Sequence, residues 1–140
     1  MDLCRQLHNE NGLFPLKEDK VRLMLRKAFN REGGVLGAVG EPGSLKGLIY
    51  MMMSSFWYSD APHWEELFLY VKPEHRGGGA AVALMRFAKW CSANSGLPLV
   101  IGVLSNERTE GKVRLYQRTF DKPVGNFFFY SANGAGHALT

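Results

Sequence analysis

Three consecutive glycines, Gly77, Gly78 and Gly79, interrupt the middle of the chain and constrain its fold more than any other feature. The residues just before them, 67–71, are almost continuously apolar, which is typical of a strand covered on both faces. Residues 78–93 follow with apolar side chains at helical spacing, and residues 99–104 are again apolar. A strand, a glycine turn, a helix and a second, central strand in this order predict a crossover between two parallel strands.

The segments before this crossover predict two helices followed by an antiparallel hairpin. Residues 2–10 and 17–29 place apolar side chains at helical spacing. Residues 35–39 and 45–56 are apolar strands on either side of a Glu-Pro-Gly turn. The next strand, residues 64–72, leads into the glycines and is closed by a proline.

The segments after the crossover predict a helix over residues 110–118, a final aromatic strand over residues 124–130 and a disordered tail over residues 133–140. Together, all these elements predict an α/β fold with one mixed sheet, antiparallel at its start and parallel at the crossover. Helices should cover both faces of that sheet.

Length and composition restrict the class of protein. A chain of 140 residues with 46% hydrophobic residues fits a single domain, residues 1–140. Its net charge of +4 comes from scattered basic residues, which suits an anionic ligand but disfavours nucleic acid as a partner. Two distant cysteines can assemble neither a disulfide framework nor a zinc cluster, so we expect no metal. The sequence has no membrane span and no signal peptide, and we expect a cytoplasmic protein.

The run from Arg76 to Ala81 has the composition of an anion-binding turn. Its glycines and alanines strip side chains from the first turn of the following helix, so that an anion can approach the free N–H groups there. Arg76 adds a positive charge. A P-loop is excluded because no Lys-Ser or Lys-Thr pair follows the glycines, and the glycine spacing does not fit a dinucleotide-binding fold.

The spacing of this run resembles the acetyl-CoA signature of the GNAT superfamily of N-acetyltransferases, which is Arg or Gln, two residues, Gly, one residue, then Gly or Ala. Arg76, Gly79 and Ala81 fill those places. The resemblance extends upstream to the apolar strand with Pro73, and downstream to a Leu-Tyr pair that includes Tyr116. In contrast to many members, the chain lacks a strand before the first helix, and Thr119 stands where a glycine is expected.

The resemblance implies a GNAT-like fold, an acetyl-CoA co-substrate and a set of donor-binding residues. In this family the strand before the turn splays from its neighbour, and the pantetheine pairs with the exposed backbone, here that of Leu69, Tyr70 and Val71. A backbone N–H near Val71 would polarise the thioester. The phosphates would lie on the turn and the helix start, formed by Arg76, Gly77, Gly78, Gly79, Ala80 and Ala81.

The resemblance also implies catalytic residues. Tyr116 matches the tyrosine that protonates the departing thiolate in many members, and a core tyrosine is the alternative. Glu65 stands where some members keep a general base, and strand alternation would put it on the same face as Leu67 and Leu69, with Glu66 facing the other way. His63 is a second candidate for the base, and a solvated glutamate without a role is the alternative to Glu65.

The acceptor would be a primary amine of a small molecule or a protein. The loop before the strand of residues 64–72 is rich in aromatics, and Trp57, Trp64 and Asp60 could surround a basic amine there. Packing of both tryptophans against the sheet is the alternative. The predicted activity is therefore acetyl-CoA-dependent N-acetyltransfer, and the alternative is a catalytically inactive acyl-CoA-binding module. The aromatic last strand, residues 125–130, favours pairing with a second chain in a homodimer.

Overall fold

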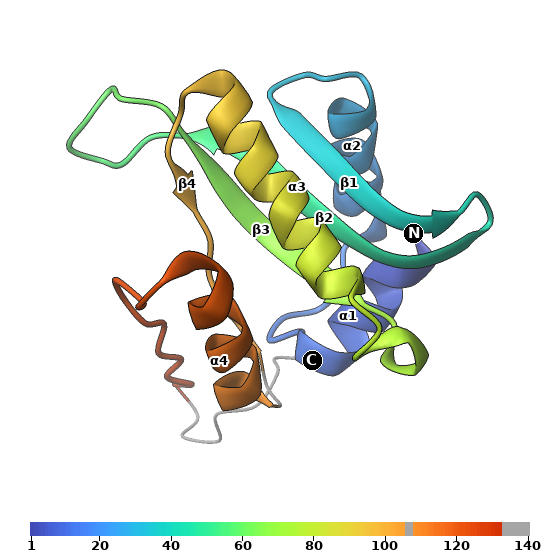
Figure 1. The fold of residues 1–140 in the computed structure, drawn as a ribbon. Helices are drawn as coiled ribbons and strands as arrows, with labels where there is room; N and C mark the ends of the chain where they lie inside the picture. Colours follow the sequence, from blue (N-terminus) through green and yellow to red (C-terminus); the bar gives the residue numbers. More distant parts are fainter. Residues whose placement is uncertain (106–107, 133–140) are drawn as a thin grey trace.

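The computed structural model describes residues 1–105 and 108–132, and it contains a four-stranded sheet between two layers of helices (Figure 1). In chain order the elements are α1 (Asp2–Asn11), α2 (Glu18–Phe29), β1 (Gly34–Glu41), β2 (Ser44–Ser54), β3 (His63–Val71), the 3-10 turn η1 (Pro73–His75), α3 (Ala80–Ser95), β4 (Leu99–Val100) and α4 (Thr109–Phe120). The two first helices, the hairpin, the strand before the glycines and the helix after them are all confirmed, with bounds shifted by a few residues.

The strands lie in the order β1-β2-β3-β4. β1 pairs with β2 and β2 with β3 in antiparallel orientation, whereas β3 pairs with β4 in parallel. The mixed sheet and its parallel crossover through α3 are therefore confirmed. The predicted α/β fold is confirmed, and two helices precede its first strand.

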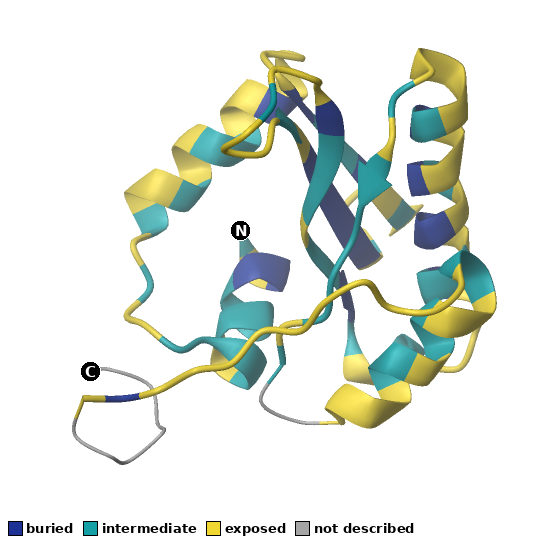
Figure 2. Ribbon diagram, turned by 90° about the vertical axis from the view of Figure 1, so that its left-hand side faces the viewer, coloured by how far each residue is buried: buried dark blue, intermediate teal, exposed yellow. Residues whose placement is uncertain are grey.

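The apolar side chains of the sheet divide between two clusters, one on each face. On one face, Ile49 and Met51 of β2 pack with Leu84 and Ala88 of α3. On the other face Leu3 of α1 joins a second cluster, which comprises the buried residues Leu3, Leu48 and Tyr70. Figure 2 shows the three layers side by side, with α3 on one side of the sheet and α1 and α2 on the other.

Two β-bulges interrupt the alternation of side chains in this sheet. The first bulge is in β3. Tyr50 of β2 is opposite Phe68 and Met51 is opposite Glu66, so Leu67, between these two β3 residues, is the extra residue. The second bulge is in β2. Val39 of β1 is opposite Gly47 and Gly40 is opposite Leu45, so Lys46, between these two β2 residues, is the extra residue. Each bulge reverses the faces that simple alternation would give to the residues beyond it.

The strand predicted over residues 99–104 is shorter and lies elsewhere than expected. Only Leu99 and Val100 pair with β3, and β4 is the edge of the sheet rather than a central strand. A continuous apolar run is typical of a strand covered on both faces, but here its second half leaves the sheet and turns toward α4 (Figure 1).

The aromatic strand predicted over residues 124–130 is wrong, because this segment forms no strand. The paired part of β4 is too short to align another strand along it. Phe129 instead packs edge-on against Phe14 of the α1–α2 connection, with ring centroids 5.9 Å apart, while Phe128 and Tyr130 are exposed. The homodimer expected from this strand stays a prediction, and the tail predicted over residues 133–140 lies outside the described residues.

Within the described ranges, no helix combines the length and apolarity needed to cross a bilayer.

Candidate active site

The turn between β3 and α3 adopts a backbone that only glycine accommodates readily. Gly77 and Gly79 have φ values of 86° and 87°, in the left-handed region. A Cβ atom added to either residue would meet no protein atom within 4 Å, so the space above them is open. Gly79 is the N-cap of α3 and no side chain caps this helix, which leaves its first N–H groups available to an anion.

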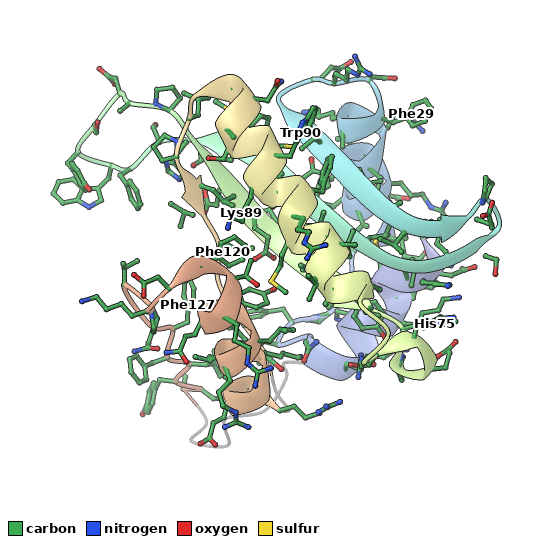
Figure 3. All side chains as sticks on the ribbon, viewed as in Figure 1. Phe29, His75, Lys89, Trp90, Phe120 and Phe127 are labelled. Atoms are coloured by element: carbon green, nitrogen blue, oxygen red, sulfur yellow. The ribbon has the colours of Figure 1, made fainter. Side chains whose placement is uncertain are left out.

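A pocket of about 360 Å³ opens at this turn. Small residues form part of its wall, among them Gly78, Gly79 and Ala80, and charged side chains stand around them. The complete lining is Val39, Lys46, Glu74, His75, Arg76, Gly78, Gly79, Ala80 and Ala83. In Figure 3, His75 lies beside the start of α3, on the far side of the molecule from Phe127. The predicted donor-binding turn thus coincides with a pocket of mixed charge and small side chains.

Arg76 of the signature is bound within the protein. Its Nε donates to the carbonyl oxygen of Val71 at 3.0 Å, and its Nη2 donates to both carboxylate oxygens of Glu10, at 2.9 and 2.7 Å. The Tyr70 hydroxyl donates to the same carboxylate at 2.7 Å, and the guanidinium lies 5.5 Å from the Tyr70 ring centroid. Arg76 therefore joins the end of β3 to the last turn of α1.

The pKa values of this network reflect the same contacts. Burial acts to raise the pKa of the Glu10 carboxyl, but hydrogen bonds from Tyr70 and Arg76 outweigh it, and the pKa lies below its usual value. Burial and the hydrogen bond to Glu10 raise the pKa of the Tyr70 phenol to about 12. Glu10 is therefore ionised near neutral pH and neutralises the Arg76 charge.

β3 and β4 separate soon after they meet. They pair only through Trp64 with Leu99 and Glu65 with Val100, while β3 continues as far as Val71. The β3 edge beyond Glu65 thus has no paired strand among the described residues, and we call the space beside this unpaired edge the gap. The family resemblance predicts such a separation of the two strands, and the glycine turn follows the far end of the unpaired edge.

The gap is bordered by segments that are distant in the sequence. Ser105, beyond β4, donates to Asn11 of α1 at 3.0 Å and accepts a hydrogen bond from Lys112 of α4 at 2.7 Å. Lys89 of α3 donates to the Thr119 carbonyl oxygen of α4 at 3.3 Å, and Figure 3 shows Lys89 above the end of α4 that carries Phe120. These contacts hold α4 beside the gap.

Glu66 and Tyr116 come together at this gap. Glu66 Oε2 accepts a hydrogen bond of 3.2 Å from the backbone N–H of Gly102, which follows β4. Desolvation raises the pKa of the Glu66 carboxyl to about 7, although the Gly102 N–H acts in the opposite direction. Desolvation, and then the negative charge of Glu66, raise the pKa of the Tyr116 phenol well above its usual value. The two side chains are therefore electrostatically coupled.

The sequence reasoning missed Glu66 because it assumed regular alternation along β3. Glu66 is opposite Met51 and Leu69 is opposite Ile49, and both partners belong to the cluster under α3. The bulge at Leu67 thus puts Glu66 and Leu69 on one face and Glu65 on the other, which corrects the expected placement of Glu65 with Leu69. The only signal for Glu66 was an acid adjoining an apolar run.

Glu65 and His63 lie together, away from this pair. His63 Nε2 lies 3.9 Å from Glu65 Oε2. His63 is buried, and its ring stacks on that of Phe56 with the ring centroids 4.7 Å apart. Glu65 shares its face with Met52 rather than Met51. Glu65 therefore lies on the face of β3 opposite to Glu66, the residue whose charge acts on Tyr116.

The predicted acceptor residues are also separated. Trp57 lies in the β2–β3 loop with 94% of its surface exposed, and residues 55–60, including Asp60, line a shallow pocket of about 480 Å³. Trp64 instead packs against the core under α3 and donates its Nε1–H to Ser95 Oγ at 2.9 Å. The loop precedes β3, whereas the glycine turn follows it, so the nine residues of β3 separate the two by about 30 Å.

Solved structures share this fold at low sequence identity. One is AAC(6')-Iy in complex with the bisubstrate analogue CoA-S-monomethyl-acetylneamine, at 16% identity and a TM-score of 0.71, with 93% of this chain and 86% of that chain covered. Another is a GCN5-related N-acetyltransferase from Ralstonia eutropha JMP134, at 24% identity and a TM-score of 0.63, with 81% and 75% covered.

A third is the aminoglycoside 6'-N-acetyltransferase AAC(6')-IG from Acinetobacter haemolyticus, at 12% identity and a TM-score of 0.64, with 90% of this chain and 87% of that chain covered. No curated protein sequence matches the chain significantly. The profile of the acetyltransferase (GNAT) family matches residues 1–121, which include the glycine turn, the gap and the helix of Tyr116. The chain therefore belongs to the GNAT acetyltransferase family.

Proposed function

We propose that residues 1–140 form one catalytic domain that transfers the acetyl group of acetyl-CoA to a primary amine of a small molecule or a protein. The observation that carries this proposal is the unpaired edge of β3, which runs from Glu66, whose charge acts on Tyr116, to the glycine turn. Acetyl transfer needs a positioned thioester, a neutral amine and a proton donor for the leaving thiolate. In this proposal the β3 edge positions the thioester, Glu66 deprotonates the amine and Tyr116 protonates the thiolate.

The donor fits the turn and the edge of β3. The uncapped start of α3 and the open space over Gly77 and Gly79 would accommodate a pyrophosphate, held by the backbone of the turn with Gly78, Ala80 and Ala81. The pantetheine would lie along the unpaired edge of Leu69, Tyr70 and Val71 as an added strand. This arrangement directs the thioester into the gap.

Glu66 is the general base in this proposal, rather than Glu65. A carboxyl with a pKa of about 7 is largely ionised above neutral pH and still basic enough to take a proton from the amine. The amine nitrogen attacks the thioester carbonyl carbon, the new C–N bond forms, and the amine proton passes to Glu66. The C–S bond then breaks, and the sulfur leaves as a thiolate that must be protonated.

Tyr116 supplies that proton, and its acidity depends on Glu66. Desolvation raises the pKa of the Tyr116 phenol most, and the charge of ionised Glu66 raises it further, so Tyr116 retains its proton. When Glu66 takes the amine proton, that charge disappears and the pKa of Tyr116 falls. Tyr116 thus becomes a stronger acid at the stage when the thiolate leaves, and protonated Glu66 can then return a proton to the phenolate.

The acceptor would contact the loop that precedes β3. The Phe56 to Asp60 loop, with Trp57 and Asp60, stays the proposed contact for an extended acceptor, although Trp64 packs in the core and would contribute only by supporting the loop. Of the neighbours in fold, AAC(6')-IG is an aminoglycoside 6'-N-acetyltransferase, and AAC(6')-Iy was solved with the bisubstrate analogue CoA-S-monomethyl-acetylneamine. Aminoglycosides therefore belong in the first panel of amines to be tried.

The test is thiol release from acetyl-CoA over a panel of aminoglycosides, polyamines and peptides with free amines. We expect release that depends on the amine and that is lost in the Glu66→Gln variant. If coenzyme A binds but no amine releases thiol, the catalytic reading is wrong and the chain is an acyl-CoA-binding module instead.

A further inference from the structure

The Arg76 guanidinium is poorly suited to bind the phosphates of the donor. Its Nε and Nη2 are engaged by Val71 and by both oxygens of Glu10, and the carboxylate neutralises its charge. Tyr70 fixes the same carboxylate with a hydrogen bond of 2.7 Å. An anion over the glycine turn would therefore meet a guanidinium whose charge is already balanced by Glu10.

A second basic side chain of the pocket, that of Lys46, is not neutralised by a carboxylate among the described residues. Lys46 of β2 lines the pocket and is exposed, and it forms no ion pair with any residue in the described ranges. Its carbonyl oxygen accepts a hydrogen bond of 2.9 Å from the N–H of Lys72, which follows β3 directly. The backbone of Lys46 is thereby fixed beside the start of the glycine turn. Glu74 is the acid on the pocket lining, and a cation would offset its repulsion of an anion.

The bulge in β2 turns Lys46 toward this pocket. Leu45 and Leu48 both pack in the cluster with α1, although they are three positions apart and regular alternation would put them on opposite faces. The extra residue, Lys46, restores them to one face and leaves Lys46 and Gly47 on the other. At Gly47 an added Cβ would come within 3.3 Å of Leu84 Cδ1, which identifies that face as the one covered by α3.

We propose that Lys46 is the side chain that binds the donor's phosphates, and that Arg76 is a positioning residue that holds the glycine turn to α1 through Glu10. The proposal rests on the proposed function, because it assumes a coenzyme A donor at this pocket. It assigns the charge that neutralises the phosphates to a bulged residue of β2, outside the signature run.

The experiment measures the affinity of two ligands, coenzyme A by calorimetry and pantetheine, which lacks the phosphates, by NMR titration. Lys46→Ala should weaken coenzyme A binding roughly tenfold, because a charge-assisted hydrogen bond is lost, and leave pantetheine binding unchanged. Lys46→Arg should restore most of the coenzyme A affinity. Lys20→Ala, which removes an exposed charge from α2, is the matched control and should change neither affinity.

Arg76→Gln should change both affinities by the same factor, because it loosens the turn and the end of β3 without removing a phosphate contact. Wild-type affinity for coenzyme A in Lys46→Ala would overturn the proposal, as would a loss in Arg76→Gln confined to coenzyme A. Failure of the wild-type protein to bind coenzyme A at all would instead reject the proposed function, and this inference with it.

Discussion

At the scale of single residues, the proposed mechanism assigns the chemistry to Glu66 and Tyr116, and the raised pKa of Glu66 predicts how the rate should depend on pH. A base acts only when deprotonated, so kcat/KM should rise with pH through an apparent pKa of about 7. Glu66→Gln should lower kcat by about 10²- to 10³-fold, with little change in coenzyme A affinity. The matched control is Glu65→Gln, which should stay within a factor of two, and a larger loss in that control would return the base to Glu65.

The Glu66 carboxyl should also lower the free energy of unfolding at high pH. Its pKa is raised from 4.5 to about 7 on folding, so the ionised form destabilises the folded state. The free energy of unfolding should therefore fall as pH rises from 4.5 through 7, by at most about 3 kcal/mol for this group, since the residue is only partly buried. Chemical denaturation at several pH values measures it, and Glu66→Gln should lack this component of the decline. Parallel pH profiles of the two proteins would contradict the raised pKa.

Tyr116 should affect turnover without affecting donor binding. Tyr116→Phe removes the hydroxyl but keeps the ring that lies 6.1 Å from Phe120, so the local packing is preserved. We expect the rate of thiol release to fall about 10²-fold while the coenzyme A dissociation constant stays unchanged. An unchanged rate would assign Tyr116 to the core and exclude it from the mechanism.

At the scale of elements, the glycine turn and the bulges determine what the strands present. Gly79 and Gly96 stand at the two ends of α3, both with positive φ and both with open space at the Cβ position. Replacing either by Val should destabilise the fold by about 1 to 2 kcal/mol through backbone strain. Only Gly79→Val should also weaken coenzyme A binding, by more than tenfold, because its side chain would fill the phosphate pocket. Equal affinities in the two variants would remove the turn from the donor site.

The elements also show where sequence reasoning succeeds and fails. Periodicity identified α2 and α3, and the glycines identified the turn, because helical spacing and positive φ leave direct marks in a sequence. The bulges at Leu67 and Lys46 leave none, since one extra residue in a strand resembles its neighbours. Regular alternation therefore favours Glu65, on the face expected for Leu67 and Leu69, over Glu66. The aromatic content of residues 124–130 predicts a strand, although a strand forms only where an edge is available to pair with it.

At the scale of the whole molecule, the aromatic segment after α4 is a candidate surface for self-association. Val124, Phe128 and Tyr130 are almost fully exposed, and Phe127 is three-quarters exposed. The homodimer predicted from the sequence should use this surface, and Phe128→Ser should shift the protein to monomer in sedimentation experiments. A wild-type protein that stays monomeric at micromolar to millimolar concentration would contradict the prediction.

The family and its donor are encoded in short local motifs, and the arrangement of the gap follows from the sheet as a whole. The separation of β3 from β4 depends on where two apolar segments stop pairing, and no single residue in the sequence indicates that position. The proposed acceptor contacts lie in a loop, residues 55–60, whose mostly exposed side chains can vary without loss of the fold.

The central claim is that the donor binds between the glycine turn and the unpaired edge of β3. Amide hydrogen exchange with and without coenzyme A tests it most directly. We predict slower exchange on binding in residues 69–71 and at the start of α3, with no change in the loop of residues 55–60. Protection confined to that loop, or coenzyme A binding without protection at the turn, would contradict the account.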